Sequence, residues 1–107
     1  MKLLALFFLF PSIINIELPQ GFKRMPTNGF GNYLRSISLK SDKTVYLYNG
    51  EKKRNQTAQY AVLDISVGNE NLQQCADAVM RLRAEYLFKN NLYDKIVFNS
   101  VSGEPLR

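Results

Sequence analysis

The sequence predicts an α+β fold: a small antiparallel or mixed sheet with one long and one short helix packed on it, in an incomplete domain. Two segments repeat apolar residues at helical spacing, and three others are rich in β-branched and aromatic residues. So few strands leave the sheet edges poorly protected, which indicates a domain that continues outside the chain. Because 107 residues with 46% hydrophobic content can bury one core but not two, we expect a single domain over residues 17–107.

Residues 1–16 fit two interpretations. Lys2 precedes the run LLALFFLFPSIINI, which has the basic start and apolar stretch of a secretory signal. That run is too short for a membrane-spanning helix of about 20 residues, so no spanning segment is expected. A small-x-small cleavage site is missing, and the alternative is a first β-strand around residues 12–18. The signal-peptide interpretation predicts export to the periplasm or cell envelope.

The first helix is predicted between Thr27 and residue 37. Thr27 or Asn28 can serve as its N-cap, although Gly29 and Gly31 weaken the helix. Apolar side chains at offsets 0, 3, 4 and 7 line one side of it, namely Phe30, Tyr33, Leu34 and Ile37.

Two strands are predicted on either side of a basic loop. Residues 45–48 alternate and then meet Asn49-Gly50, a dipeptide that easily supplies two positive φ angles in a tight hairpin. Residues 59–68, rich in β-branched and aromatic residues, are the expected antiparallel partner. On that strand Asp64 points away from its apolar neighbours, so we expect it to be exposed. A third strand is predicted over residues 94–101, followed by the polar end SGEPLR.

The long helix is expected to begin at Asn69 or Asn71 and to end near residues 89–91. Arg83 falls on its apolar stripe, where it should snorkel or meet a carboxylate, so we assign a structural role to Arg83 with Asp64 or Glu85 as partner. The stripe consists of Leu72, Cys75, Ala76, Val79, Leu82 and Tyr86, and the opposite side of Asp77, Arg81 and Glu85.

Cys75 is the only cysteine and has two interpretations. Its place on the apolar stripe favours packing, because cysteine is among the residues most often buried. Its place near a helix start favours reactivity, since unpaired backbone N–H groups stabilise a thiolate there. The chain has no histidine, so it offers no Cys-His pair. A lone cysteine cannot build a zinc site, and we expect neither a metal nor another cofactor.

The charge balance favours an anionic partner only where the basic residues gather. The chain has 14 Lys and Arg against 9 Asp and Glu, a net charge of +5. Lys52, Lys53 and Arg54 form the densest run and are candidate binding residues, although such a run is more often a solvated loop. No nucleic-acid signature accompanies them, so no nucleic acid is expected as partner.

Several stretches together resemble a known family. The segments are LPQGFKRM, YLRSISLK, VYLYNGEKK, YAVLDISVG, LQQCADAVMRLRAEYL and IVFNSVSG. They resemble the N-terminal part of an uncharacterised bacterial family named domain of unknown function 4846, over nearly all of residues 17–103. The resemblance implies an exported protein of Bacteroides-like bacteria and a longer family domain, of which residues 17–107 are the N-terminal portion. The final SGEPLR is expected to depart from the family after Gly103.

The resemblance also implies a candidate chemistry. The later half of the family pattern carries a Gly-His-Ala-Val type strand, similar to the histidine strand of papain-like cell-wall peptidases and amidases. Cys75 would then match the nucleophile, although this chain, without a histidine, is catalytically incomplete.

Two functions therefore stay open, and whether the protein is an enzyme stays open with them. The first is an exported envelope protein of unknown activity, with a cell-wall polymer or an envelope protein as possible partner. The second is the N-terminal part of a papain-like thiol hydrolase or amidase acting on the cell wall, with Cys75 as nucleophile.

Overall fold

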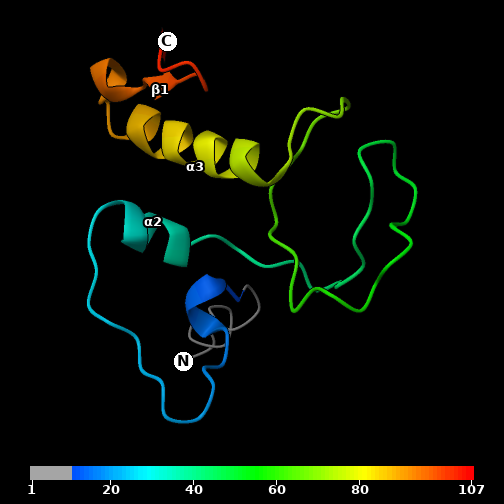
Figure 1. Cartoon of the computed structure of the whole chain (residues 1–107). Helices are drawn as coiled ribbons and strands as arrows, with labels where there is room; N and C mark the ends of the chain where they lie inside the picture. Colours follow the sequence, from blue (N-terminus) through cyan, green and yellow to red (C-terminus); the bar gives the residue numbers. More distant parts are fainter. Residues whose placement is uncertain (1–10) are drawn as a thin grey trace, which may run out of the picture. The chain divides into compact units, whose positions relative to one another are not determined.

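A computed structural model describes residues 11–107, and residues 1–10 of the expected signal peptide lie outside the described part. The alternative first strand around residues 12–18 lies inside it, where the structure has a 3-10 helix over Ile13–Asn15. The chain divides after Asn71 into an N-terminal unit and a C-terminal unit. Figure 1 follows the ribbon from helix α2 through long loops to helix α3 and strand β1. One short helix, one long helix and a two-stranded antiparallel sheet confirm the predicted α+β class.

The N-terminal unit contains the 3-10 helix η1 (Ile13–Asn15) and the helix α2 (Phe30–Arg35), which pack against each other. The backbone N–H of Ile13 donates to the carbonyl of Ile37 at 3.0 Å. Arg24 Nη2 donates to the carbonyl of Ile16 at 2.8 Å and so ties the following loop to the end of η1.

Helix α2 confirms the predicted apolar face. Ile37, just past its end, is only 9% exposed, and the helical members of the stripe are half-buried. The N-cap is Gly29 with φ 52°, one residue after Asn28 and two after Thr27, the two predicted caps. Glycine adopts this left-handed conformation without the Cβ clash that other residues would meet.

The strand pairing of the N-terminal unit differs from the prediction. Residues 59–68 meet the chain through an antiparallel bridge between Leu63 and Leu39, whereas Tyr46 is bridged to Lys52. The expected pairing of 45–48 with 59–68 is therefore wrong. The reason is local: the turn after Tyr46 closes so tightly that the basic residues directly behind it become the partner.

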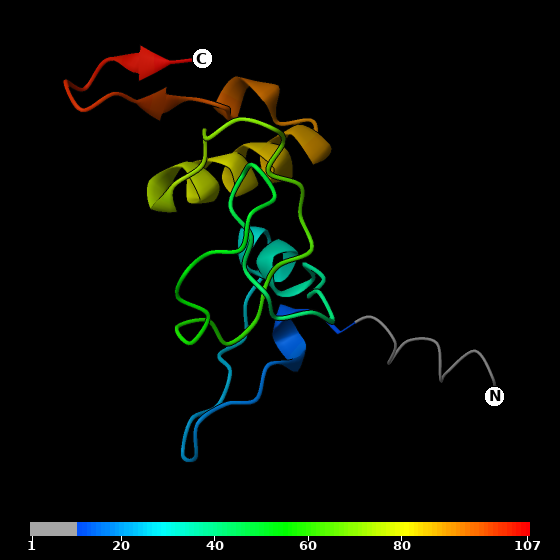
Figure 2. The ribbon, with the colours of Figure 1, turned by 90° about the vertical axis from the view of Figure 1, so that its right-hand side faces the viewer.

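The C-terminal unit consists of helix α3 (Cys75–Lys89), the 3-10 helix η2 (Tyr93–Lys95) and strands β1 (Phe98–Asn99) and β2 (Pro105–Leu106). Phe98 pairs with Leu106 and Asn99 with Pro105 in antiparallel register. Figure 2 shows the two strands as a short hairpin that follows η2. Strand β1 lies inside the predicted third strand, and β2 forms within the polar end SGEPLR, where no strand was predicted.

Helix α3 begins later than predicted and buries only part of the expected stripe. Gln74 is its N-cap, in place of Asn69 or Asn71, and the predicted end is confirmed. Leu82 and Leu87 are 8% and 3% exposed, whereas Leu72 and Val79 are 67% and 62% exposed. Because η2 follows the C-terminal end of the helix and packs against it, burial concentrates in that half.

Candidate functional site

The Asn49-Gly50 turn builds a tight hairpin, which we call the basic hairpin (residues 45–54). The N–H of Gly50 donates to the carbonyl of Leu47 at 3.0 Å, and the N–H of Leu47 donates to the carbonyl of Glu51 at 2.7 Å. Gly50 has φ 87°, while Asn49 keeps a negative φ. The predicted turn is thus confirmed with one positive φ angle in place of two. This geometry is a type I turn closed by a left-handed glycine.

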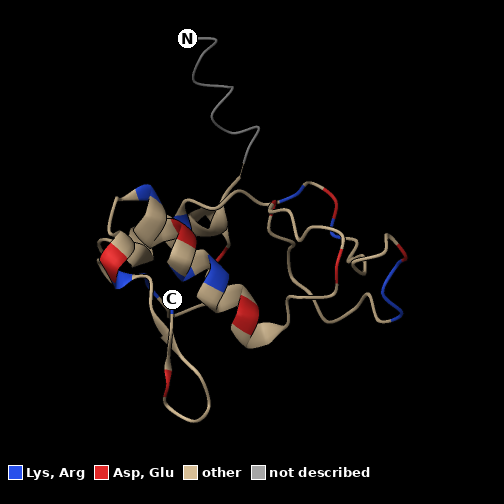
Figure 3. Ribbon diagram, turned by 90° about the horizontal axis from the view of Figure 1, so that it is seen from above, with Lys and Arg blue, Asp and Glu red and all other residues tan. Residues whose placement is uncertain are grey.

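The predicted binding residues stand on the returning limb of this hairpin. Lys52, Lys53 and Arg54 are exposed, and the N–H of Lys53 donates to the carbonyl of Val45 at 2.9 Å. Figure 3 shows a continuous blue stretch beside a red position on this loop. Residues 40–54 carry five basic residues against two acidic ones, a net +3 of the chain's +5. The backbone that carries these cations is therefore hydrogen-bonded across the hairpin.

Beside the hairpin lies a polar pocket of about 240 Å³, lined by Asp42, Lys43, Thr44, Lys52, Gln56 and Gln59. The side-chain amide of Gln56 links the backbone segments that line the pocket through hydrogen bonds. The Gln56 Oε1 accepts the N–H of Val45 at 2.9 Å, and its Nε2 donates to the carbonyls of Val45 at 2.9 Å and Lys53 at 2.6 Å. This amide joins both limbs of the basic hairpin to the pocket.

Gln59 and Tyr60 both contact Lys43, one of the residues that line the polar pocket. Gln59 Nε2 donates to the backbone carbonyl of Lys43 at 2.8 Å and to Gln56 Oε1 at 3.1 Å. The ammonium of Lys43 lies 5.4 Å from the centroid of the Tyr60 ring, within the range of a cation–π contact. Main chain and side chain of Lys43 are both restrained.

Asp42 supplies a negative charge to the same pocket. Its Oδ1 accepts the backbone N–H of Thr44 at 2.9 Å. That hydrogen bond, followed by one from the Thr44 hydroxyl and by the charges of Lys52 and Lys40, lowers the pKa of Asp42 below its ordinary value. Asp42 is therefore ionised at neutral pH.

Cys75 is exposed, and the packing interpretation is wrong. It is the first residue of α3, one position after Gln74, whose backbone N–H donates to Asp77 Oδ2 at 3.1 Å. The sulfur lies outside the core because the helix begins at Cys75, whereas its buried residues lie further along it. No cluster of three or more potential metal ligands occurs among residues 11–107.

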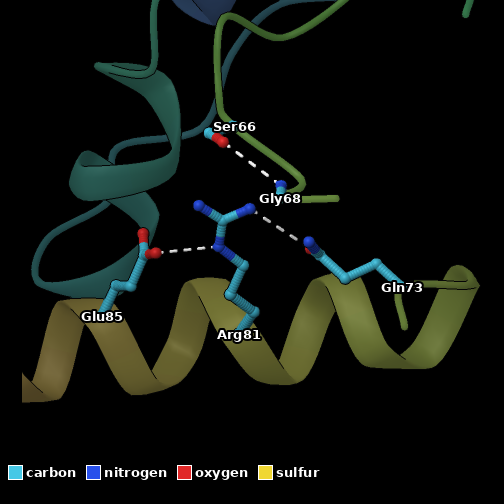
Figure 4. A network of polar contacts seen from close by, with 5 residues as sticks. All are labelled: Ser66, Gly68, Gln73, Arg81 and Glu85. Carbon is cyan, nitrogen blue, oxygen red and sulfur yellow. Dashed lines mark hydrogen bonds and ion pairs between the residues drawn. The ribbon is translucent and has the colours of Figure 1, made fainter. Parts of the chain in front are cut away.

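On the charged face of α3, Arg81 and Glu85 form an ion pair. Arg81 Nε donates to Glu85 Oε1 at 2.8 Å, and Arg81 Nη1 donates to Gln73 Oε1 at 3.3 Å (Figure 4). These contacts link the segment before the helix to its third turn. They serve the helix and present no open polar site.

Two further residues had a predicted structural role. The guanidinium of Arg83 lies 5.6 Å from the centroid of the Tyr86 ring, and the side chain is half-buried, so Arg83 covers an aromatic neighbour. Asp64 is exposed, as its place in an extended segment predicted. A carboxylate partner for Arg83 stays a prediction.

Sequence reasoning identified the cations of this region but missed the pocket beside them. Asp42, Gln56 and Gln59 were not singled out, because long-range side-chain hydrogen bonds to backbone leave no periodic pattern. A local signal did exist: the pairs Asp42/Thr44 and Asn55/Thr57 are typical of Asx turns, which bend the chain around its own side chains.

Comparison with known protein families assigns the chain to one of them. The family model named domain of unknown function (4846) matches residues 14–107. The chain belongs to this family. Because the match in this family reaches Arg107, the expected departure after Gly103 is wrong.

Membership in the domain of unknown function (4846) family brings no evidence of an activity. No curated protein and no solved structure is similar enough to this chain to count as a match. Within residues 11–107, no helix combines the length and hydrophobicity needed to cross a bilayer.

Proposed function

We propose that this chain belongs to an exported envelope protein whose N-terminal unit binds an anionic cell-envelope polymer through the basic hairpin. The observation that carries the proposal is the hydrogen-bonded turn, which fixes Lys52, Lys53 and Arg54 on an exposed limb. A preordered group of cations loses less conformational freedom on binding than a loose loop does.

A polymer suits this surface better than a small anion. Each exposed ion pair is worth only about 0–1 kcal/mol, so useful affinity requires several contacts at once. A polyanion supplies repeated charges along its length, and the net +3 of residues 40–54 attracts it before contact. The half-exposed rings of Tyr46 and Tyr48, both 48% exposed, add aromatic surface next to the cations.

The test measures binding of the purified chain to polygalacturonate and to isolated peptidoglycan in low salt, by pull-down and isothermal titration calorimetry. The variant Lys52→Ala/Lys53→Ala/Arg54→Ala should reduce binding about tenfold or more, since it removes three charges of about 0–1 kcal/mol each together with their steering effect. Binding that persists unchanged in this variant overturns the proposal.

A matched control removes three cations elsewhere. Lys23, Lys89 and Lys95 are exposed and lie outside the basic hairpin. Their triple alanine variant has the same net charge as the hairpin variant and should keep most of the binding. Equal losses in both variants would show that only the net charge matters.

The second candidate is a thiol hydrolase or amidase acting on the cell wall, favoured by the exposure of Cys75 on the first turn of α3. Its thiolate would attack an acyl carbon and release the leaving group, while a base from outside this histidine-free chain takes the thiol proton. Iodoacetamide alkylation at neutral pH tests it. Labelling of the wild-type chain no faster than that of a model thiol, with Cys75→Ala as the blank, would count against a reactive cysteine.

A further inference from the structure

The polar pocket combines cations with hydrogen-bond acceptors that are not used up. Gln56 is fully engaged, because its oxygen accepts from Val45 and Gln59 and its nitrogen donates to Val45 and Lys53. Both N–H groups of Gln59 are engaged as well. Within the part of the chain that the structure describes, Gln59 Oε1 accepts no hydrogen bond from another residue.

Lys43 and Lys52 are the basic residues in the lining of the pocket. Lys43 is placed by Tyr60 and by the hydrogen bond of Gln59 to its carbonyl. The backbone of Lys52 is held by its bridge to Tyr46, and its side chain is exposed. An ammonium group has three donors and no acceptor, so a ligand with negatively charged oxygens can accept hydrogen bonds from both lysines.

The acceptors decide which kind of anion fits. A phosphate or sulfate presents mainly acceptor oxygens, so it offers few donors to Gln59 Oε1 and to the Asp42 carboxylate. A simple amine would donate to Asp42 and Gln59, but its positive charge would be repelled by Lys43 and Lys52. A ligand that carries a carboxylate and several hydroxyl donors on one small ring satisfies both sets of groups.

We propose that the polar pocket binds a uronic acid unit, with its carboxylate on Lys43 and Lys52 and its hydroxyls donating to Gln59 Oε1 and Asp42. The inference rests on the proposed polymer binding and names the sugar class that the pocket selects. Thr44 contributes indirectly, since its backbone N–H holds the Asp42 carboxylate in place.

The experiment follows the side-chain amides of Gln56 and Gln59 by ¹H–¹⁵N NMR during titration of the whole chain. Sodium galacturonate should shift the Gln59 amide in a saturable way. Galactose has the hydroxyls without the carboxylate, sodium acetate has the carboxylate without the hydroxyls, and sodium phosphate is a plain anion. At equal concentration and ionic strength these three should cause little shift. Equal shifts with acetate or phosphate, or none with galacturonate, overturn the inference.

Two single substitutions, one inside the pocket and one outside it, locate the binding site. Lys43→Met keeps an unbranched side chain and removes the charge in the pocket, and it should weaken galacturonate binding about tenfold, the size expected for a lost charge-assisted hydrogen bond. Lys40→Met removes a neighbouring charge that does not line the pocket and should weaken it much less. Equal weakening in both variants contradicts a pocket.

The two proposals fail in different ways. Polygalacturonate binding that depends on the basic hairpin, without any response to galacturonate, refutes the pocket and leaves the polymer function standing. A specific galacturonate response without polymer binding supports a free sugar as the ligand and refutes the polymer function. The wild-type ligand series needs no variant, so misfolding of Lys43→Met would not affect it.

Discussion

The replacement Leu87→Ala tests whether the buried side chain of Leu87 stabilises the C-terminal unit. Leu87 is 3% exposed, the lowest exposure among the core residues of the described part. Truncation to alanine removes three carbon groups, worth about 0.8 kcal/mol each, so the transfer cost alone is about 2.4 kcal/mol. The cavity left behind adds to this, and buried Leu→Ala replacements typically cost about 2 to 5 kcal/mol. With so few buried side chains around it we expect the lower part of that range.

The assay is urea unfolding followed by circular dichroism, with Phe88→Ala as the adjacent control. At a typical slope of about 1–3 kcal/mol per molar urea, Leu87→Ala should lower the midpoint by about 1 to 2 M. Phe88 is 64% exposed and contacts Tyr93 edge to face at 5.2 Å, so its truncation should cost about 1 kcal/mol or less. Equal losses for both variants would refute the assigned burial of α3.

Two predictions concern the region around the polar pocket. Gly50→Ala should destabilise the basic hairpin by about 1–2 kcal/mol because φ 87° is costly for any residue with a Cβ, and ¹H–¹⁵N shifts of residues 45–54 that stay unchanged would contradict it. Asp42 should titrate below its ordinary pKa, first because the Thr44 N–H bonds its carboxylate. Its stabilising effect is therefore complete above the unfolded-state pKa and is lost as the pH falls through the lower folded-state pKa. A ¹³C carboxyl titration with an ordinary midpoint would contradict this.

The helices were the part of the fold best predicted from sequence, and the reason is that local periodicity determines them. The apolar stripe of α2 and the end of α3 near Lys89 are confirmed. The start of α3 was misplaced because asparagine is a common N-cap, whereas here Gln74 and Asp77 form the first turn. The predicted start placed Cys75 in the second turn of the helix, whereas Cys75 is its first residue.

Strand partners were predicted less well because pairing depends on turn geometry. The Asn49-Gly50 dipeptide predicts the observed hairpin, but the predicted partner strand begins ten residues further along the chain. A turn of three residues leaves no room for an intervening basic loop, so Lys52 pairs with Tyr46. The site was half predicted for the same reason: the cations stand out in the sequence, while Gln56 and Gln59 act only through the folded backbone.

Salt dependence separates the two kinds of recognition that we propose for the N-terminal unit. In the proposed function, the exposed cations of the basic hairpin attract a polymer over distances that salt screens, since the Debye length is about 10 Å at 0.1 M and about 3 Å at 1 M. Polygalacturonate binding should therefore fall steeply as sodium chloride rises. Within the polar pocket, hydrogen bonds to Gln59 and Asp42 depend on contact geometry and on neutral donors, which salt does not screen. The preference for galacturonate over acetate should persist at 0.5 M salt, where the Debye length is about 4 Å. If that preference disappears together with the polymer binding, the pocket selects charge alone and its acceptors have no part in recognition.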